Sequence, residues 1–438
     1  MSAATARLVA GPTFASLRVR NYRLFAFGSV ITSTGTWMQR VAQDWLVLQL
    51  TASGAALGIT TGLQFLPMLL LSPIAGVLAD RFPKRRVLMV TQSAMGVSAA
   101  LLGVLAVTGI ATVAHVYVIA FLFGTASAFD QPARQAFVNE MVGPEMVVNA
   151  VGLNSASFNL ARMIGPALAG ALIALLGSGV RATGWVIVLT AATYLVVLYT
   201  LTRLRADELH PPPLLPRAKG QLGDAVRYVR SRPDIMLVLG VVFCGGTFGL
   251  NFQLTTALMA TEVYGKGAGE YGILGSILAV GSLAGGLVAA RRKASRQRLV
   301  IVAAIAFGVA EVIVGLMPSY LTFALFLPVC GFAGLTMITA ANSFVQTTTD
   351  ATMRGRVMAL YMMIFMGGTP IGAPVLGFVA DHFGARWTLI GGGALTALGT
   401  IVVVLLTSGR QGIEPTSYLH TRAYRAAAAD RLTPVGGD

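Results

Sequence analysis

Charged residues are scarce in this 438-residue sequence. Asp, Glu, Lys and Arg together make up 11% of it, whereas hydrophobic residues make up 55%, and the mean hydropathy is +0.74. A water-soluble domain needs more charge than this, since about a quarter of the residues in an average globular domain are charged. The scarcity excludes an ordinary soluble protein and favours one whose solvent is lipid.

Several motifs that carry chemistry are also missing. The two cysteines, Cys244 and Cys330, lie in separate apolar runs and form no CxxC motif, which excludes a secreted-type disulfide framework. The sequence has no GxxxxGK[ST] phosphate-binding loop and no HExxH zinc-binding helix. The four histidines are dispersed at or outside the ends of the apolar runs, at His115, His210, His382 and His420. We therefore expect no enzyme activity, no ATP-driven pump, no metal and no cofactor.

Long apolar runs are what the sequence has in abundance. A helix of ~20 residues spans ~30 Å of hydrocarbon, and a helix satisfies every backbone N–H within its own segment. The predicted fold class is an all-α membrane protein with twelve transmembrane helices. The spans are expected at residues 22–50, 55–79, 86–108, 114–131, 147–177, 183–203, 234–261, 270–290, 299–317, 320–341, 357–379 and 387–407.

Basic residues are unevenly distributed between these spans. If the N-terminus is cytoplasmic, the cytoplasmic segments hold 27 of the 32 Lys and Arg residues, and the outer loops hold only Arg181, Lys266 and Arg386. The positive-inside rule then places both termini in the cytoplasm of a bacterial inner-membrane protein. The net charge of +15 is a signal of topology, and no nucleic-acid partner is expected.

The longest connection divides the spans into two sets of six. It contains Pro211-Pro212-Pro213 and Pro216, followed by Leu222, Val226 and Val229 at helical spacing. This pattern predicts a stiff linker and then a short amphipathic helix on the inner membrane surface. The expected domains are a cytoplasmic N-terminus (1–21), an N-terminal bundle (22–203), the linker (204–233), a C-terminal bundle (234–407) and a basic cytoplasmic tail (408–438).

The two sets of spans resemble each other. The segment after span two, 76–86, has a weaker echo after span eight, 286–296, and glycine–proline clusters occur in spans five and eleven. Such repeats are typical of transporters that work by alternating access. We therefore expect two pseudo-symmetric six-helix bundles.

Four ionisable residues lie deep within the spans: Arg40, Asp44, Arg162 and Glu311. Each costs at least ~2.5 kcal/mol in hydrocarbon on insertion scales, so each is expected to face a cavity or a partner. They are candidates for proton coupling or for the substrate cavity. The alternatives are structural ion pairs and positions near the outer interface.

The first predicted span, 22–50, carries many polar side chains on one face. At 100° per residue, a face of Thr32, Thr36, Gln39 and Gln43 is extended by Arg40 and Asp44. We expect this face to line the cavity between the halves, since it is too polar for lipid. Arg40 and Asp44 are neighbours at i, i+4. Asp44 is interpreted as a protonation site, and Arg40 either sets its charge state or helps to hold the substrate; the alternative is a permanent ion pair near the outer third of the membrane. The opposite side is expected to carry Met38, Val41, Ala42, Trp45 and Leu46.

The segment from Gly76 to Arg86, GVLADRFPKRR, resembles the loop signature G-x-x-x-D-R-x-G-R-R of the major facilitator superfamily, with Pro83 in place of a glycine. The resemblance covers about residues 20–407. It implies a cytoplasmic gate in which Asp80 braces the closed inner side, with Arg134 as its expected partner; a solvated loop charge is the alternative. The gate residues implied are Gly76, Asp80, Arg81, Arg85, Arg86 and Arg134.

Other segments narrow the resemblance. GTWMQRVAQDW (35–45) and DQPARQAF (130–137) resemble the bacterial branch of enterobactin-type and macrolide-type exporters. Span five resembles the antiporter motif G-x8-G-x3-G-P-x2-G-G, matched by Gly152, Gly165, Pro166 and Gly170, although a generic kinked, tightly packed helix is an alternative. Many proton-coupled members carry an arginine four residues before a glycine in span four, where this chain has Ala120 before Gly124. Proton coupling here would need other residues.

The resemblance implies a secondary exporter of a small amphipathic molecule, such as a drug-like compound, natural product or siderophore, driven by protons. We expect it to act as a monomer among membrane lipids. Two alternatives stay open: a lipid or lysolipid flippase of the same fold, and a non-transporting receptor or assembly partner.

Overall fold

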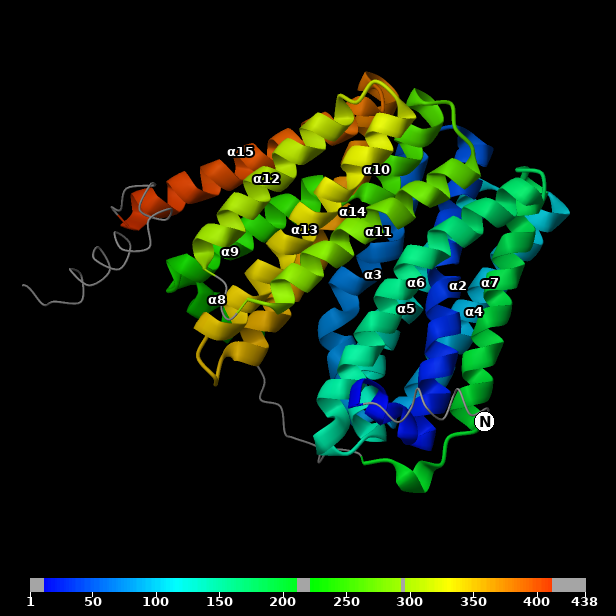
Figure 1. Cartoon of the computed structure of the whole chain (residues 1–438), viewed down its shortest axis with the longest axis horizontal. Helices are drawn as coiled ribbons and strands as arrows, with labels where there is room; N and C mark the ends of the chain where they lie inside the picture. The colour runs from blue at the N-terminus through cyan, green and yellow to red at the C-terminus, as the bar shows by residue number, and fades with distance from the viewer. Residues whose placement is uncertain (1–11, 211–220, 293–295, 412–438) are drawn as a thin grey trace, which may run out of the picture.

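The computed structural model describes residues 12–210, 221–292 and 296–411. Every regular element in these ranges is a helix (Figure 1). Eleven helical stretches are long and apolar enough to span a membrane. Their outer faces expose large apolar side chains such as Val97, Leu195 and Leu325, which suits lipid rather than water. The remaining predicted span, 22–50, is α2 (Arg20–Thr51), whose length of 32 residues is sufficient but whose buried polar side chains lower its hydropathy.

The first group of helices contains α2 and five further long helices. Helix α4 packs on α5 and α7, and α2 packs on α6 and α7. Local signals set the helix ends: Ala56 N donates to Ser53 Oγ (3.1 Å) at the start of α3, and Gly109 adopts a left-handed φ of +81° after α4. The elements are η1 (Pro12–Arg18), α3 (Gly54–Arg81), α4 (Lys84–Thr108), α5 (Val113–Met141), η2 (Pro144–Met146), α6 (Val147–Leu175), α7 (Val180–Thr202) and η3 (Ala206–Glu208).

The second group begins with an interrupted helix in place of the single helix expected over 234–261. Two π-helical turns interrupt it, and α14 crosses very close to the first of them: a Cβ on Gly372 would collide with Thr247 O, and one on Gly368 would lie 2.5 Å from the carbonyl carbon of Gly246. The glycines of this crossing allow the irregular path. The pieces are α9 (Pro233–Cys244), η4 (Gly245–Gly249), α10 (Phe252–Leu258) and η5 (Met259–Val263). The remaining helices are α11 (Ala268–Ala290), α12 (Gln297–Gly315), α13 (Tyr320–Thr348), α14 (Arg354–Phe383) and α15 (Arg386–Gln411).

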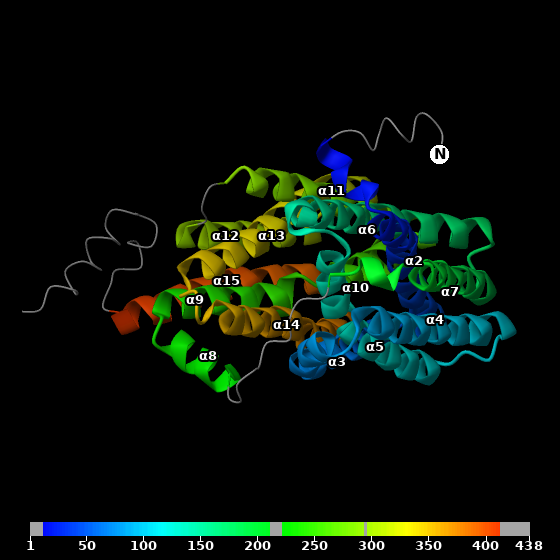
Figure 2. The same ribbon diagram turned by 90° about the horizontal axis from the view of Figure 1, so that it is seen from below.

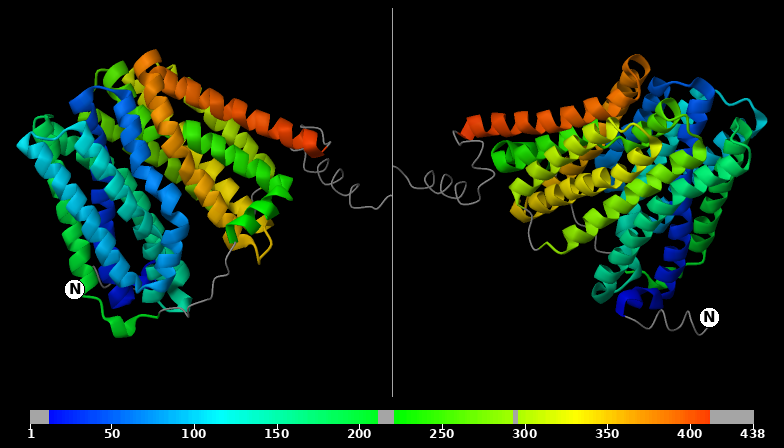
Figure 3. Two further views of the ribbon diagram at one scale, coloured as in Figure 1. Left: turned by 180° about the vertical axis from the view of Figure 1, so that it is seen from behind. Right: turned by 45° about the horizontal axis from the view of Figure 1, so that its top comes forward.

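The two groups form a wedge. They lie close together at one end and diverge toward the end that carries η1 and α8 (Gln221–Arg230) (Figures 1 and 3). The groups contact each other mainly through α3 with α14 and through α6 with α11 (Figure 2). We call the two ends of the molecule the closed end and the α8 end. The predicted fold class of two six-helix bundles is confirmed.

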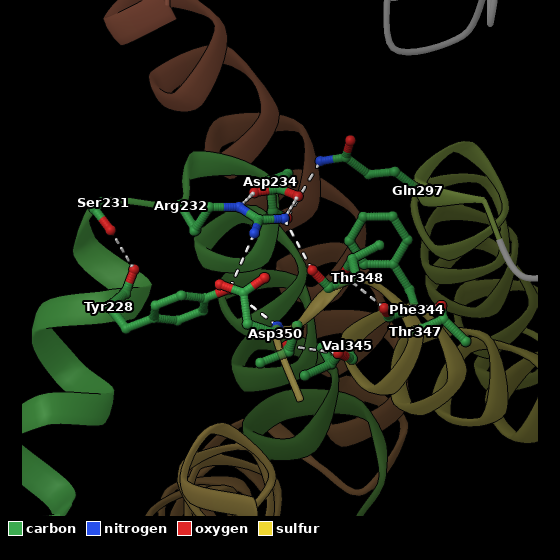
Figure 4. A network of polar contacts seen from close by, with 11 residues as sticks. Tyr228, Ser231, Arg232, Asp234, Gln297, Phe344, Val345, Thr347, Thr348 and Asp350 are labelled. Carbon is green, nitrogen blue, oxygen red and sulfur yellow. Dashed lines mark hydrogen bonds and ion pairs between the residues drawn. The ribbon is translucent and has the colours of Figure 1, made fainter. Parts of the chain in front are cut away.

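Helix α8 (Gln221–Arg230) lies in the linker where the sequence predicts a short amphipathic helix. Its Val229 side chain is buried against the second bundle. A polar network fastens its end (Figure 4): Arg232 forms a two-point ion pair with Asp234 (3.0 and 2.8 Å) and donates to Tyr228 OH (3.0 Å), which donates to Asp350 Oδ2 (3.0 Å). The helix is therefore docked on the bundle. The linker prolines and the Leu222 side chain lie outside the described residues.

Candidate functional site

A cavity of about 280 Å³ lies between the two bundles. We call it the central cavity. Its walls come from α2, α3 and α6 of the first bundle and from α10, α11, α13 and α14 of the second. Small-molecule sites have volumes of roughly 300–1,000 Å³, so the cavity suits a compact ligand. Its walls are rich in aromatic side chains: Trp37, Phe65, Phe252, Tyr271 and Phe365.

A second cavity, of about 290 Å³, lies within the first bundle and shares Trp37 and Arg40 with the central cavity. We call it the vestibule. Its residues come from the first parts of α2 and α6 and from the second half of α5, with Met95 from α4, so it extends toward the α8 end. Most of its lining side chains are polar, including Ser29, Ser33, Thr36, Gln131, Gln135 and Asn154. The polar vestibule therefore adjoins the central cavity at Trp37 and Arg40, on its α8 side.

Arg40 and Arg162, two of the candidate residues, both line the central cavity. The Arg40 guanidinium lies over the rings of Trp37 (4.9 Å) and Phe65 (5.1 Å). Arg162 Nη2 donates to Asn159 Oδ1 (3.1 Å) on its own helix. Neither arginine forms an ion pair with any described carboxylate, and the Nε atom of each has no hydrogen-bond partner in the described chain.

Asp44 is almost completely buried where the two bundles meet, with 1% of its surface exposed. Its Oδ2 accepts hydrogen bonds from Gln253 Nε2 (2.5 Å) on α10 and Tyr271 OH (3.0 Å) on α11. The neighbouring Trp45 stacks on Tyr271, with ring centroids 6.4 Å apart. Asp44 and Arg40 form no ion pair in this conformation, since the second bundle supplies the hydrogen-bond partners of Asp44; the influence of Arg40 on the charge state of Asp44 stays a prediction.

Apart from Arg40, the polar face predicted for span one points away from the central cavity. Thr190 Oγ1 donates to Gln39 Oε1 (2.6 Å), Thr32 Oγ1 donates to Thr193 O (3.2 Å), and Thr36 contacts Tyr194 OH (3.1 Å). These contacts face α7 inside the first bundle, where hydroxyl groups substitute for water. Gln39 and Gln43, both buried, are thus wrong as cavity residues. The cavity side is the face of Trp37, Arg40 and Val41, roughly 120° away around the helix.

Glu311 is also wrong as a cavity residue. It is buried on α12 with 1% exposure. Its Oε2 lies 2.8 Å from the position that a Cβ would take at Gly249 in η4, and no described donor contacts that oxygen. It is an isolated acid inside the second bundle, and its role in proton coupling stays a prediction.

The predicted cytoplasmic gate lies at the α8 end. The Asp80 side chain is outside the described residues, so its pairing with Arg134 stays a prediction. Arg134 is paired with Asp130 (3.1 Å) and donates to Ser29 Oγ (3.1 Å). Arg85 Nη2 donates to Thr202 O (3.0 Å) at the end of α7. Of the other predicted gate residues, Gly76 and Arg81 lie near the end of α3 and Arg86 lies at the start of α4. Gly76 is half-buried, and the two arginines are exposed.

Two buried acids at this end were missed. Asp130 accepts hydrogen bonds from Thr91 Oγ1 (2.9 Å) and Gln92 Nε2 (2.7 Å) in addition to its contact with Arg134. Glu140 forms a buried ion pair with Lys84 (2.9 Å). The i, i+4 spacing of Asp130 and Arg134 is a local signal that could have revealed the first pair. No local signal links Glu140 to Lys84.

The antiporter-like motif of α6 is a packing surface over part of its length. A Cβ at Gly165 would lie 2.6 Å from Trp37 Cβ on α2. A Cβ at Gly170 would collide with Ala268 O on α11, and Pro166 O occupies the corresponding space beside Gly272. Gly152 has open space around it. The helices therefore approach closely at Gly165, Pro166 and Gly170, but not at Gly152.

The closed end contains a contact that sequence reasoning missed. The Asp381 carboxylate at the end of α14 caps the start of α3 in the other bundle. Ser53 Oγ (2.7 Å), Gly54 N (2.5 Å) and Ala55 N (3.1 Å) all donate to it. A signal was present: Gly377-x-x-Ala-Asp381-x-Phe-x-x-Arg386 repeats the pattern of 76–85, Gly-x-x-Ala-Asp-x-Phe-x-x-Arg.

The comparisons with known proteins agree with this architecture. The sequence matches the family described as transmembrane secretion effector over residues 11–421. A bacterial homologue of the human lysosomal transporter Spinster, in an inward-facing and occupied conformation, has the same fold, with a TM-score of 0.69 at 18% identity over 95% of this chain and 99% of that one. A D-xylose–proton symporter has a TM-score of 0.70 at 12% identity, covering 87% and 96% of the two chains.

Curated relatives match along most of their length. The multidrug efflux pump Tap of Mycolicibacterium fortuitum is 27% identical over 89% of this chain and 96% of its own. The staphyloferrin A transporter of Staphylococcus aureus is 25% identical, with coverages of 88% and 94%. The enterobactin exporter EntS of Citrobacter koseri is 25% identical, with coverages of 84% and 86%.

Proposed function

The chain belongs to the transmembrane secretion effector family, a bacterial exporter branch of the major facilitator superfamily, and we propose on that basis that it exports a small amphipathic molecule by proton antiport. It is a multi-pass membrane transporter and not an enzyme. The proposed substrate is a drug-like compound, natural product or siderophore, and the names of the relatives support this range.

One observation carries the proposal: the central cavity lies between bundles that are joined at one end and separated at the other. The distribution of basic residues supports placing the α8 end in the cytoplasm of a bacterial inner-membrane protein. In that orientation the conformation is inward-open, and the vestibule is the entry route for a cytoplasmic substrate. Export requires the bundles to rock, so that contacts at the closed end break and the α8 end closes.

Asp44 is the proposed proton-coupling residue. Its hydrogen bonds come from Gln253 and Tyr271 of the other bundle, so rocking at the closed end removes them. Hydrogen bonding and solvation set how strongly a carboxylate holds a proton. A residue whose partners change with the transport cycle meets the requirement for coupling.

Proteoliposomes test the proposal. The protein, acting as a monomer among the vesicle lipids, is reconstituted with pyranine trapped inside and an acidic lumen, and compounds are added outside. The expected result is a compound-dependent rise in luminal pH and compound accumulation inside, both abolished by collapsing the pH gradient. Compound flux with no response to that gradient would contradict proton antiport, and absence of any flux over a broad compound panel would contradict transport.

A further inference from the structure

We infer that the central cavity selects amphipathic anions: molecules with an aromatic or apolar body and at least one carboxylate or similar oxyanion. This inference rests on the proposed function and specifies its substrate class. It follows from the two arginines that face the cavity and from the lack of an ion pair between either of them and a described carboxylate.

The charged side chains that line the central cavity are Arg40 and Arg162. Neither guanidinium is paired with a described carboxylate, and each keeps an unpartnered Nε. Asp44, four residues from Arg40, is held by Gln253 and Tyr271 of the other bundle, and Asp130 in the vestibule is paired with Arg134. The cavity is therefore locally cationic in the absence of a ligand.

Uncompensated charge is costly in a membrane interior, and an anionic ligand removes that cost. Guanidinium groups bind carboxylates through two parallel hydrogen bonds, with charge assistance. The same charges repel a cationic ligand in a low-dielectric site. Both considerations favour an anion over a cation of the same size.

The remaining walls recognise the body of the ligand. Trp37 and Phe65 flank the Arg40 guanidinium, and Phe252, Tyr271 and Phe365 come from the second bundle. Flat aromatic surfaces bind rings through stacking and burial of apolar area. A ring system with an acidic group would place its acid at the arginines and its ring between the bundles.

Three probes of matched shape test the inference on purified protein: 1-naphthylacetate, 1-naphthaleneethanol and 1-naphthylethylamine. Binding is measured for wild type, Arg40→Gln, Arg162→Gln and Arg181→Gln, in which the exposed Arg181 at the start of α7 is the control. We expect wild type to prefer the anion by about tenfold or more. The two cavity variants should lose this preference and keep their affinity for the alcohol, and the Arg181 variant should behave as wild type.

Thermal unfolding separates this role from a structural one. If the guanidiniums are uncompensated, Arg40→Gln and Arg162→Gln should unfold at the same temperature as the ligand-free wild type or above it. A large drop would reveal a structural partner and contradict the inference. Equal loss of anion and alcohol binding, or preferred binding of the amine, would also contradict it.

An anionic lipid headgroup has the same chemistry as a soluble anion. Lysophosphatidylglycerol and lysophosphatidylcholine are therefore added as competitors of 1-naphthylacetate. Competition by the first alone would support the anion site and assign it to lipid, and competition by neither would assign it to a soluble anion. Competition by both to the same extent would contradict charge selection.

The outcomes for the anion site and for the exporter proposal can be told apart. If the anion binds selectively but no pH gradient moves it, the exporter proposal fails and the anion site stands. If the protein exports only amines against their gradient, the exporter proposal stands and the anion site fails.

Discussion

Asp44 and Arg40 show what can be inferred at the level of single residues. Charged residues within apolar runs are conspicuous in a sequence, and the structure places both in or beside the central cavity region. Their partners were not predictable, because Gln253 and Tyr271 are distant in the chain and belong to the other bundle. The i, i+4 rule describes neighbours on one helix and says nothing about a second helix that packs against it.

The buried pair of Lys84 and Glu140 gives a prediction at this scale. Both side chains are less than a tenth exposed. Lys84→Met should lower the free energy of unfolding by about 3–5 kcal/mol, because it leaves Glu140 buried without a partner. The double variant Lys84→Met/Glu140→Leu should recover most of this loss. The measurement is thermal unfolding in detergent, with the exposed Arg86→Met as the control.

Within single elements, hydropathy located the helices but not their rotation or their breaks. The polar face of α2 is too polar for lipid, and for that reason the sequence predicts that it lines the cavity. The hydroxyl groups of α7 satisfy that polarity inside the bundle. The interruption at η4 depends on how closely α14 crosses it, which is a property of two elements and leaves no trace in the hydropathy of one.

The cap that Asp381 forms on α3 gives a prediction at the scale of elements. Three hydrogen bonds tie the bundles together at the closed end. Asp381→Asn should weaken them by roughly 1–3 kcal/mol, since bonds to a charged group are worth more than neutral ones. The population should therefore move toward a conformation that is open at this end.

Distances between spin labels measure that shift. Labels at Ile110→Cys and Leu321→Cys, both exposed near the closed end, should gain a longer-distance population in Asp381→Asn, on a background without Cys244 and Cys330. His382→Asn is the control, because His382 is the next residue and is not part of the cap. An unchanged distance distribution in Asp381→Asn would show that the cap does not hold this end closed.

The sequence predicted more about the whole molecule than about its single residues or helices. The number of spans and their pairing into two bundles follow from hydropathy and internal repeats, because lipid leaves few alternatives to the helix. The sequence did not predict which end of the molecule is open, because this depends on the balance of contacts at the two ends of the cavity. Substrate identity did not follow either, because the cavity walls come from seven helices.

The orientation of the protein in the membrane is a testable property of the whole molecule. The distribution of basic residues predicts that the α8 end is cytoplasmic. Ser178→Cys, in the α6–α7 connection, should react with an impermeant maleimide in intact spheroplasts. Arg227→Cys, on the exposed side of α8, should react only after permeabilisation. Reaction of both cysteines in intact spheroplasts would contradict the predicted topology.

The central claim is that Asp44 couples proton movement to export through the cavity between the bundles. The most direct measurement compares wild type and Asp44→Asn in proteoliposomes. Two quantities are measured: accumulation of substrate against its concentration gradient, and exchange of substrate down that gradient. Asn keeps the shape of Asp44 and an acceptor oxygen for Gln253 and Tyr271, but it cannot bind and release a proton. The account predicts that uphill accumulation falls to background while downhill exchange persists. Uphill accumulation by Asp44→Asn with the pH dependence of wild type would contradict it.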